Sequence, residues 1–377
     1  MNHSYWEQDA FGTWDALILG GGIVGLSCAI RLAQLDPTLQ VAVLDAHPLP
    51  TGATTRSAGF ACTGSPTELL ADVDAMGWER TVELVAARWD GLTRLRERVG
   101  DDALGLHLDG GWELLPPGQE QVLHRLDALN RHLAPVFGAA PFQNRPEVDF
   151  GFPRDRVAHL VHHRFEGGLH PGRLARSLMR LAASLGVLRL PSMPALSLDP
   201  AHDHVDVRTP RLALRARVVA CCTNAFTSSL LPDLPITPGR GQVLLTEPLS
   251  GGHPLQGVFH MDAGYVYFRG VGDRVLIGGA RNLAEAEETT ATFGPNPRLH
   301  AHLEALLHEV VVPGRAPRVA QRWSGIMAFG PTREPILREA LPRVFVGARL
   351  GGMGVALGTR LGDQLAERMH ERLDAAG

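Results

Sequence analysis

Residues 14–45 read WDALILGGGIVGLSCAIRLAQLDPTLQVAVLD, and this stretch decides the fold. Residues 14–19 are mostly apolar and predict a buried strand. Residues 23–35 carry apolar side chains at helical spacing, and residues 41–44 form a second short apolar run. Buried apolar strands joined through a helix are typical of a parallel sheet that is covered on both faces. The stretch therefore predicts a strand–helix–strand unit of the Rossmann type.

The glycines between the predicted strand and helix have the spacing Gly20-x-Gly22-x-x-Gly25. In this context the first glycine permits a tight turn, the second lets the backbone approach a pyrophosphate, and the third allows close helix–strand packing. The free amides of the helix N-terminus favour phosphate groups, and an acid at the end of the second strand suits ribose hydroxyls. The predicted dinucleotide-binding residues here are Gly20, Gly22, Ile23, Val24, Gly25, Asp45 and Ala46.

The segment after the second predicted strand favours FAD over NAD. Residues 52–60 read GATTRSAGF, in which small residues, hydroxyls and one arginine suit a loop over a pyrophosphate and an isoalloxazine ring. No second dinucleotide motif follows, because Gly270-Val271-Gly272 is expected to be a hairpin turn. The loop adds these predicted cofactor-binding residues: Thr55, Arg56, Ser57, Ala58 and Gly59.

Composition excludes several other functions. The 377 residues, 45% of them hydrophobic, are enough for two or three domains. With 36 basic against 40 acidic residues, the net charge of -4 argues against a nucleic-acid partner. All 36 basic residues are arginine, so pyridoxal chemistry, a phosphate-binding P-loop and protein-kinase chemistry, which need a lysine, are excluded.

The cysteines and the apolar stretches give further negative expectations. The four cysteines form no Cys-x-x-Cys pair, and the histidines form no His-Glu-x-x-His motif, so we expect no disulfide framework and no metal site. The longest uncharged stretch, residues 16–30, is too short and too rich in glycine to span a bilayer. We therefore expect a cytoplasmic protein with no transmembrane segment.

On these motifs the sequence resembles the FAD-dependent D-amino acid oxidase superfamily, which includes glycine oxidase, sarcosine oxidase and D-amino acid dehydrogenase. It looks most similar to the gamma-glutamylputrescine oxidoreductase branch, which has a similar Arg-x-Ala-Gly-Phe loop. Further family-like motifs follow in the family's order along nearly the whole chain. They lie at residues 168–173, 218–224, 240–242, 323–325 with 332–336, and 351–354.

The resemblance implies an α/β fold with a discontinuous Rossmann-type FAD-binding domain and an inserted α+β substrate domain built on an antiparallel sheet. The FAD-binding domain is expected at residues 14–85, 150–225 and 325–377, and the substrate domain at 86–149 and 226–324. The terminal glycine turn contains no cysteine, so FAD is expected to bind non-covalently. The resemblance also assigns these residues to the cofactor: Thr223, Gly351, Gly352, Met353 and Gly354.

The reaction implied by the resemblance is oxidation of a C–N bond by hydride transfer to flavin N5, giving an imine that hydrolyses. The flavin is the redox centre, so no catalytic side chain is assigned. The chain lacks the lysine that some oxidases of the family place above the flavin, which leaves the electron acceptor open between oxygen and a quinone or other carrier.

The substrate is expected to be a small amine. Amino-acid-specific members carry an arginine shortly after a Trp-x-Gly motif, where this chain has Met327. Tyr265 and Tyr267 share a face if residues 260–268 are one strand, and they would line an amine site that leaves out His260. Arg349, before the glycine turn, is the best-placed arginine for a substrate carboxylate.

Two alternatives remain open. The first is an α-amino acid or N-methylglycine oxidase or dehydrogenase that holds the carboxylate with Arg349 or another arginine. The second is a flavin-binding scaffold or sensor without turnover.

Overall fold

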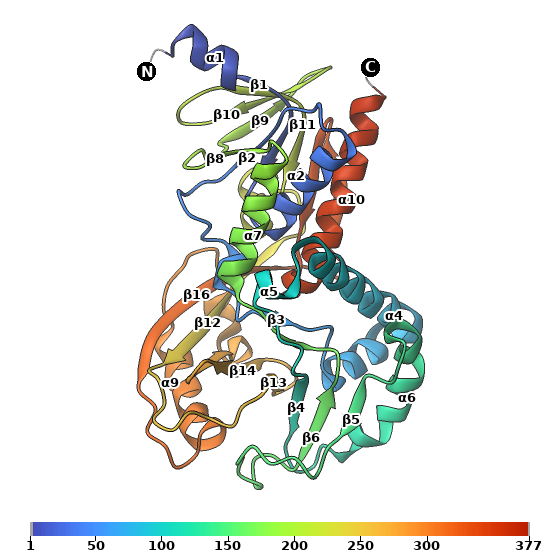
Figure 1. Cartoon of the computed structure of the whole chain (residues 1–377), viewed down its shortest axis with the longest axis vertical. Coiled ribbons are helices and arrows are strands. Elements are labelled where there is room, and N and C mark those ends of the chain that lie inside the picture. The colour runs from blue at the N-terminus through green and yellow to red at the C-terminus, as the bar shows by residue number, and fades with distance from the viewer. Residues whose placement is uncertain (1–2, 376–377) are drawn as a thin grey trace.

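The computed structural model describes residues 3–375 and places two large sheets at opposite ends of the molecule (Figure 1). The first sheet has the order β17-β18-β11-β1-β2-β8, and β10 and β9 continue from β11. β1 pairs in parallel with β11 and β2, whereas β17 and β10 pair antiparallel to their neighbours. Its strands are β1 (Thr13–Leu19), β2 (Val41–Leu44), β8 (Leu188–Leu190), β9 (Ser197–Pro200), β10 (Val205–Arg208), β11 (Leu214–Cys221), β17 (Ile336–Leu341) and β18 (Val344–Ala348).

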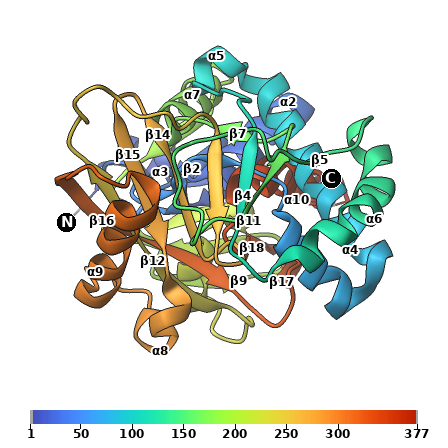
Figure 2. The same cartoon turned by 90° about the horizontal axis from the view of Figure 1, so that it is seen from below.

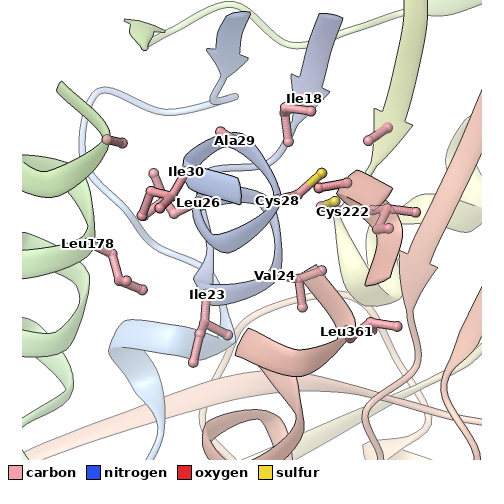
Figure 3. Packing of buried hydrophobic residues seen from close by; sticks show 14 of the residues in the cluster. Ile18, Ile23, Val24, Leu26, Cys28, Ala29, Ile30, Leu178, Cys222 and Leu361 are labelled. Atoms are coloured by element: carbon pink, nitrogen blue, oxygen red, sulfur yellow. The ribbon is translucent and has the colours of Figure 1, made fainter. Parts of the chain in front are cut away.

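Both faces of the first sheet are buried, as the apolar runs predict. Alternate residues of β1 point to opposite faces, so Ile18 packs against the helices and Leu17 against the β10 side. Three helices cover the first face, with Cys28 and Leu361 among the buried side chains between them (Figure 3). They are α2 (Ile23–Leu35), α7 (Pro171–Ser184) and α10 (Gly354–Asp374). The strand–helix–strand prediction for residues 14–45 is confirmed.

The second sheet has the order β16-β12-β15-β14-β13-β4-β6-β5. All of its pairings are antiparallel except the one between β13 and β4. Its strands are β4 (Gly111–Leu115), β5 (Phe142–Asn144), β6 (His159–His163), β12 (Thr237–Thr246), β13 (Val258–Met261), β14 (Val266–Val271), β15 (Arg274–Gly279) and β16 (Val319–Phe329). A two-stranded sheet of β3 (Phe60–Ala61) and β7 (Gly167–Gly168) lies beside it.

Helices pack on the two ends of the second sheet (Figure 2). α4 (Pro66–Val99) and α6 (Glu120–Phe137) lie at one end, and α9 (Pro297–Leu306) with η3 (Leu307–Val311) at the other. α4 bends at Gly77, whose φ is +83°. The shorter elements are α1 (Tyr5–Phe11), α3 (Ala53–Arg56), α5 (Asp101–Leu104), η1 (Asn224–Ser229), η2 (Arg281–Ala284) and α8 (Glu285–Glu288).

The structure contradicts the expectation that residues 260–268 form one strand. They form a hairpin, because Asp262 and Ala263 take left-handed φ values of 53° and 52° and turn the chain between β13 and β14. His260 therefore pairs directly with Tyr267. Residues opposite each other in a sheet point to the same face, so the face-parity reason for leaving His260 out of the site does not hold.

Strand pairing also bears on where the boundary between the two predicted domains lies. β6 pairs with β4 and β5 of the second sheet, although residues 150–225 are expected in the FAD-binding domain. A boundary after residue 163 describes this pairing better than one at residue 150. In the part of the chain that the structure describes, no helix combines the length and apolar character needed to cross a bilayer.

Candidate active site

A cavity of about 1790 Å³ lies between the two sheets and is lined by residues from both. The first sheet and its helices supply the glycine turn after β1, and the second supplies Gly241 of β12 and Tyr267 of β14. Pockets for single small molecules usually have about 300–1,000 Å³. The cavity is therefore large enough for a dinucleotide and a small substrate together.

The glycine turn at the start of α2 has the conformation that the sequence predicts. Gly20 has a φ of +101°, which favours glycine. A Cβ atom on Gly25 would lie 1.9 Å from the carbonyl oxygen of Gly20, so this residue packs the helix against the strand and does not line the cavity. Gly22 is the N-cap of α2 and provides no side-chain cap, which leaves that end of the helix open to an anionic group.

Asp45 fastens the glycine turn and has a cationic neighbour that the sequence did not reveal. Its Oδ1 accepts a hydrogen bond from the amide of Gly21 at 2.9 Å. Its Oδ2 accepts one from Nε of Arg189 at 2.7 Å. Arg189 lies on β8, which is the strand next to β2, so only the sheet brings the two residues together.

In the segment before β3, some residues line the cavity and others do not. Thr54, which sequence analysis missed, accepts a hydrogen bond from the amide of Ile23 at 3.0 Å and lines the cavity. The Thr55 hydroxyl instead donates to the carbonyl of Pro50 at 2.9 Å. Ser57 and Ala58 line the cavity, whereas Thr55 and Gly59 do not.

Arg56 ties this loop to the second sheet. Its Nη1 donates to the carbonyl of Ser324 on β16 at 2.8 Å, and its guanidinium lies 4.4 Å from the ring centroid of Phe293. In return, Nε1 of Trp323 donates to the carbonyl of Arg56 at 2.9 Å. The predicted cofactor residue Arg56 lines the cavity and also joins its two walls.

A second helix opens onto the same cavity. Gly351 and Gly352 have φ values of +56° and +88° and lead into α10, whose N-cap Met353 makes no side-chain cap. These residues, Gly354 and Thr223 all line the cavity. Two helix N-termini whose N-cap residues provide no side-chain cap meet at one cavity, which suits a ligand with a central pyrophosphate. The donor set therefore fits FAD, and the phosphate site predicted at α2 stays a prediction.

The predicted substrate residues take unequal positions in the wall. Tyr267 packs edge-on against Phe60 at a ring distance of 5.5 Å, and burial raises the pKa of its phenol to about 12. Tyr265 is 45% exposed, at the rim. Met327 lies between Gly241 and Gly352, because Cβ atoms on these glycines would meet its Cε and Sδ atoms at 3.1 and 3.7 Å.

Arg349 lines the cavity, but its guanidinium is bonded to the protein itself. Nη1 donates to the carbonyl of Pro235 at 3.2 Å, and Nη2 donates to the carbonyl of Glu334 at 2.8 Å and to the hydroxyl of Thr332 at 2.9 Å. A carboxylate clamp would require several of these bonds to break.

Buried acids lie behind the wall near β13. Burial raises the pKa of Glu113 to about 7, although Thr67 and Ser65 hydrogen-bond its carboxylate. Burial likewise raises the pKa of Glu166 to about 7 and lowers the pKa of His260 to about 4. Sequence analysis missed Glu113 and Glu166 because no local motif marks them.

α4 adds paired charges to the wall. Nη2 of Arg88, which is 2% exposed, lies 3.1 Å from the Glu68 carboxylate. Asp72 receives Nε of Arg333 at 3.0 Å on Oδ1, while its buried Oδ2 has no hydrogen-bond partner. Burial raises the pKa of Asp72 even though Arg333 opposes this change. Asp72 therefore lines the cavity with an unpaired carboxylate oxygen that is buried within the wall.

Comparisons with known proteins agree with this geometry. The model of the FAD dependent oxidoreductase family (DAO) matches residues 15–368. The probable oxidoreductase OrdL of Haemophilus influenzae is 22% identical over 244 residues, which span 63% of this chain and 56% of that protein.

Solved structures share the fold at low sequence identity. Glycine oxidase from Geobacillus kaustophilus is 21% identical, with a TM-score of 0.73 over 96% of this chain and 95% of that one. L-proline dehydrogenase from P. horikoshii is 16% identical, with a TM-score of 0.77 over 96% and 94%. NikD, an amino acid oxidase of nikkomycin biosynthesis, is 17% identical, with a TM-score of 0.71 over 94% of each chain. The family model covers nearly the whole chain, and the chain belongs to the FAD dependent oxidoreductase family.

Proposed function

We propose that this protein binds FAD non-covalently and oxidises the C–N bond of a small amine that carries no carboxylate next to its nitrogen. The observation that carries this proposal is that the arginines of the cavity are bonded to other groups of the protein. Within residues 3–375, seven arginines line the cavity, and each has a partner in the protein. They are Arg56, Arg80, Arg88, Arg281, Arg333, Arg349 and Arg360. A substrate carboxylate would have to compete with these partners for a guanidinium.

The unused oxygen of Asp72 supports a cationic substrate. Its side chain is 4% exposed, and Oδ2 has no hydrogen-bond partner. A buried acceptor without a partner lowers the stability of the folded protein. An ammonium group supplies three donors and a positive charge. We infer that the substrate enters with an ammonium group toward Asp72. This group is either the nitrogen that is oxidised or a second nitrogen of the same molecule.

Bound FAD would supply the hydride acceptor of the reaction. The protein's own contribution is to position the substrate and to exclude water. Phe60, Tyr267 and Met327 form an apolar part of the wall, and the neutral phenol of Tyr267 adds a hydrogen-bonding group without a charge. The open end of α2 would hold the pyrophosphate.

An α-amino acid substrate is the second candidate, and Arg281 is the residue that favours it. Its Nη1 lies 3.4 Å from Glu285, whose side chain is 71% exposed, so this is a weak pair. The guanidinium stacks over Phe329 at 4.4 Å and faces the cavity. Arg281 could exchange Glu285 for a substrate carboxylate more easily than Arg349 could leave its carbonyl partners.

Anaerobic visible spectra of the flavin-loaded protein test the two candidates. The protein is titrated with alkylamines, diamines, glycine, sarcosine and proline, and flavin bleaching is followed. The proposal expects bleaching by amines, and Asp72→Asn should raise the amine concentration for half-bleaching about tenfold through loss of a charged hydrogen bond.

Arg281→Gln is the matched variant on the opposite wall. If only α-amino acids bleach the flavin, and this variant abolishes their effect, the second candidate replaces the first. A flavin that no compound of the panel reduces would favour a scaffold or sensor without turnover.

A further inference from the structure

Three side chains that can bind a metal ion converge beside the substrate part of the cavity. Cys62 follows β3, Glu166 precedes β7, and His260 belongs to β13. The Cys62 sulfur, a Glu166 carboxylate oxygen and a His260 imidazole nitrogen all lie within 4.8 Å of one another. The proposed amine oxidation uses none of the three, so this group, named here the Cys62 cluster, needs a separate explanation.

The imidazole of the Cys62 cluster has an unsatisfied nitrogen. Nε2 of His260 is buried and has no hydrogen-bond partner. It lies 3.9 Å from Oε2 of Glu166, which is too far for a hydrogen bond. A buried polar atom without a partner destabilises the folded state. A ligand between these atoms would remove that destabilisation.

The carboxylate of the Cys62 cluster is held in place by the backbone. Oε1 of Glu166 accepts hydrogen bonds from the amides of Thr63 at 2.6 Å and Gly64 at 3.1 Å. Nε2 of His163 lies 3.9 Å from the same oxygen. With Oε1 occupied in this way, Oε2 is the oxygen turned toward His260. Outer contacts of this kind orient ligating carboxylates in metal sites.

One sulfur, one nitrogen and one oxygen donor suit zinc better than magnesium or calcium, which prefer oxygen alone. Cys62 and His260 line the cavity, whereas Glu166 does not, so the side without a protein ligand faces the cavity. Three protein ligands with one open position are typical of zinc sites that bind small molecules. A thiolate and a carboxylate also balance the two charges of the ion, which favours its burial.

We propose that Cys62, Glu166 and His260 form a zinc site whose fourth coordination position opens into the cavity. Binding forms bonds from zinc to sulfur, nitrogen and oxygen, and the thiol S–H bond breaks and releases its proton to solvent. No electron is transferred. The open position would take water, or an oxygen or nitrogen donor of a small molecule. This inference stands independently of the proposed amine oxidation.

Zinc titration of the flavin-loaded protein, with no metal-affinity tag, tests the site. Zinc per chain is measured by mass spectrometry, and affinity by competition with a chelating indicator. We expect one zinc per chain in the wild type and at least about a hundredfold weaker binding in His260→Gln and in Cys62→Ser, since even outer contacts are worth 10–100-fold. His162→Gln, on the same strand as His163 but outside the Cys62 cluster, should keep the wild-type affinity.

X-ray absorption at the zinc edge provides a readout that does not depend on activity. The proposal expects one sulfur at about 2.3 Å together with nitrogen and oxygen ligands at about 2.0–2.2 Å. Substoichiometric zinc in the titrated wild type overturns the proposal, and so does a zinc spectrum without sulfur. Equal zinc affinity in the wild type, His260→Gln and Cys62→Ser would place the metal elsewhere and overturn it as well. Flavin content and circular dichroism check that each variant is folded.

Discussion

The two sides of the cavity offer different kinds of chemical group. The first-sheet side offers backbone: helix ends and glycines at α2 and α10, with Asp45 holding the turn. The second-sheet side offers side chains: His260 lines the wall, and Glu113 and Glu166 are buried behind it. A backbone site depends on conformations that a local motif encodes, whereas a side-chain site depends on strands that meet only in the folded chain. The difference explains why a cofactor is easier to predict here than a substrate.

The largest loss of stability is expected at Gly25, because the packing of α2 against β1 leaves no space for an added atom there. A Cβ atom would lie 1.9 Å from the Gly20 carbonyl oxygen, so Gly25→Ala forces α2 away from β1. We expect a loss of about 4 kcal/mol or more in the free energy of unfolding, measured by urea denaturation. Gly354→Ala is the control, because its Cβ would meet only Leu350 at 3.7 Å, and its effect should stay within about 1 kcal/mol. Equal stability of the two variants would contradict the packing role.

The next effect separates cofactor binding from folding. Gly22→Val places a branched side chain at the open end of α2, where a first added atom already lies 3.2 Å from Oγ1 of Thr54. We expect a folded protein whose FAD affinity falls at least about a hundredfold, or about 3 kcal/mol. The flavin-to-protein absorbance ratio after gel filtration measures this loss. Asp45→Ala should also strip FAD, since the carboxylate that fastens Gly21 is removed. Full flavin content in both variants would exclude this turn as the FAD site.

The smallest effect is expected on the second-sheet side, where the stability contribution of Glu113 depends on pH. Glu113 has its pKa raised to about 7 by burial, from an ordinary value of 4.5, so the folded state binds its proton more tightly than the unfolded state. Its contribution to stability is complete below pH 4.5 and is lost as the pH rises through 7. Relative to Glu113→Gln, the wild type should lose about 2–3 kcal/mol between pH 4.5 and pH 8.

Urea denaturation of the wild type and Glu113→Gln at several pH values measures this difference. Parallel curves for the two proteins would show that Glu113 stays ionised in the fold. The wild type and Gly354→Ala should give parallel curves of stability against pH, because this change on the first-sheet side neither adds nor removes a titratable group.

The sequence alone determined the FAD-binding half in considerable detail. Spacing identified the turn from Gly20 to Gly25, and apolar runs identified β1, α2 and β2. These features are local: a tight turn, a helix period and a short buried strand each need only neighbouring residues. The Gly351–Gly354 turn was located by its resemblance to the family, and the structure places it at the same cavity.

Only the tertiary structure decided what faces the substrate. One turn at residues 262–263 folds a predicted single strand into a hairpin, which puts His260 opposite Tyr267. Arg349 has the position that the sequence suggested, but distant carbonyls occupy its guanidinium. The Cys62 cluster joins three strand ends that are far apart in the chain. Such contacts follow from the register of whole strands, and a one-residue shift in register reverses which side chains meet.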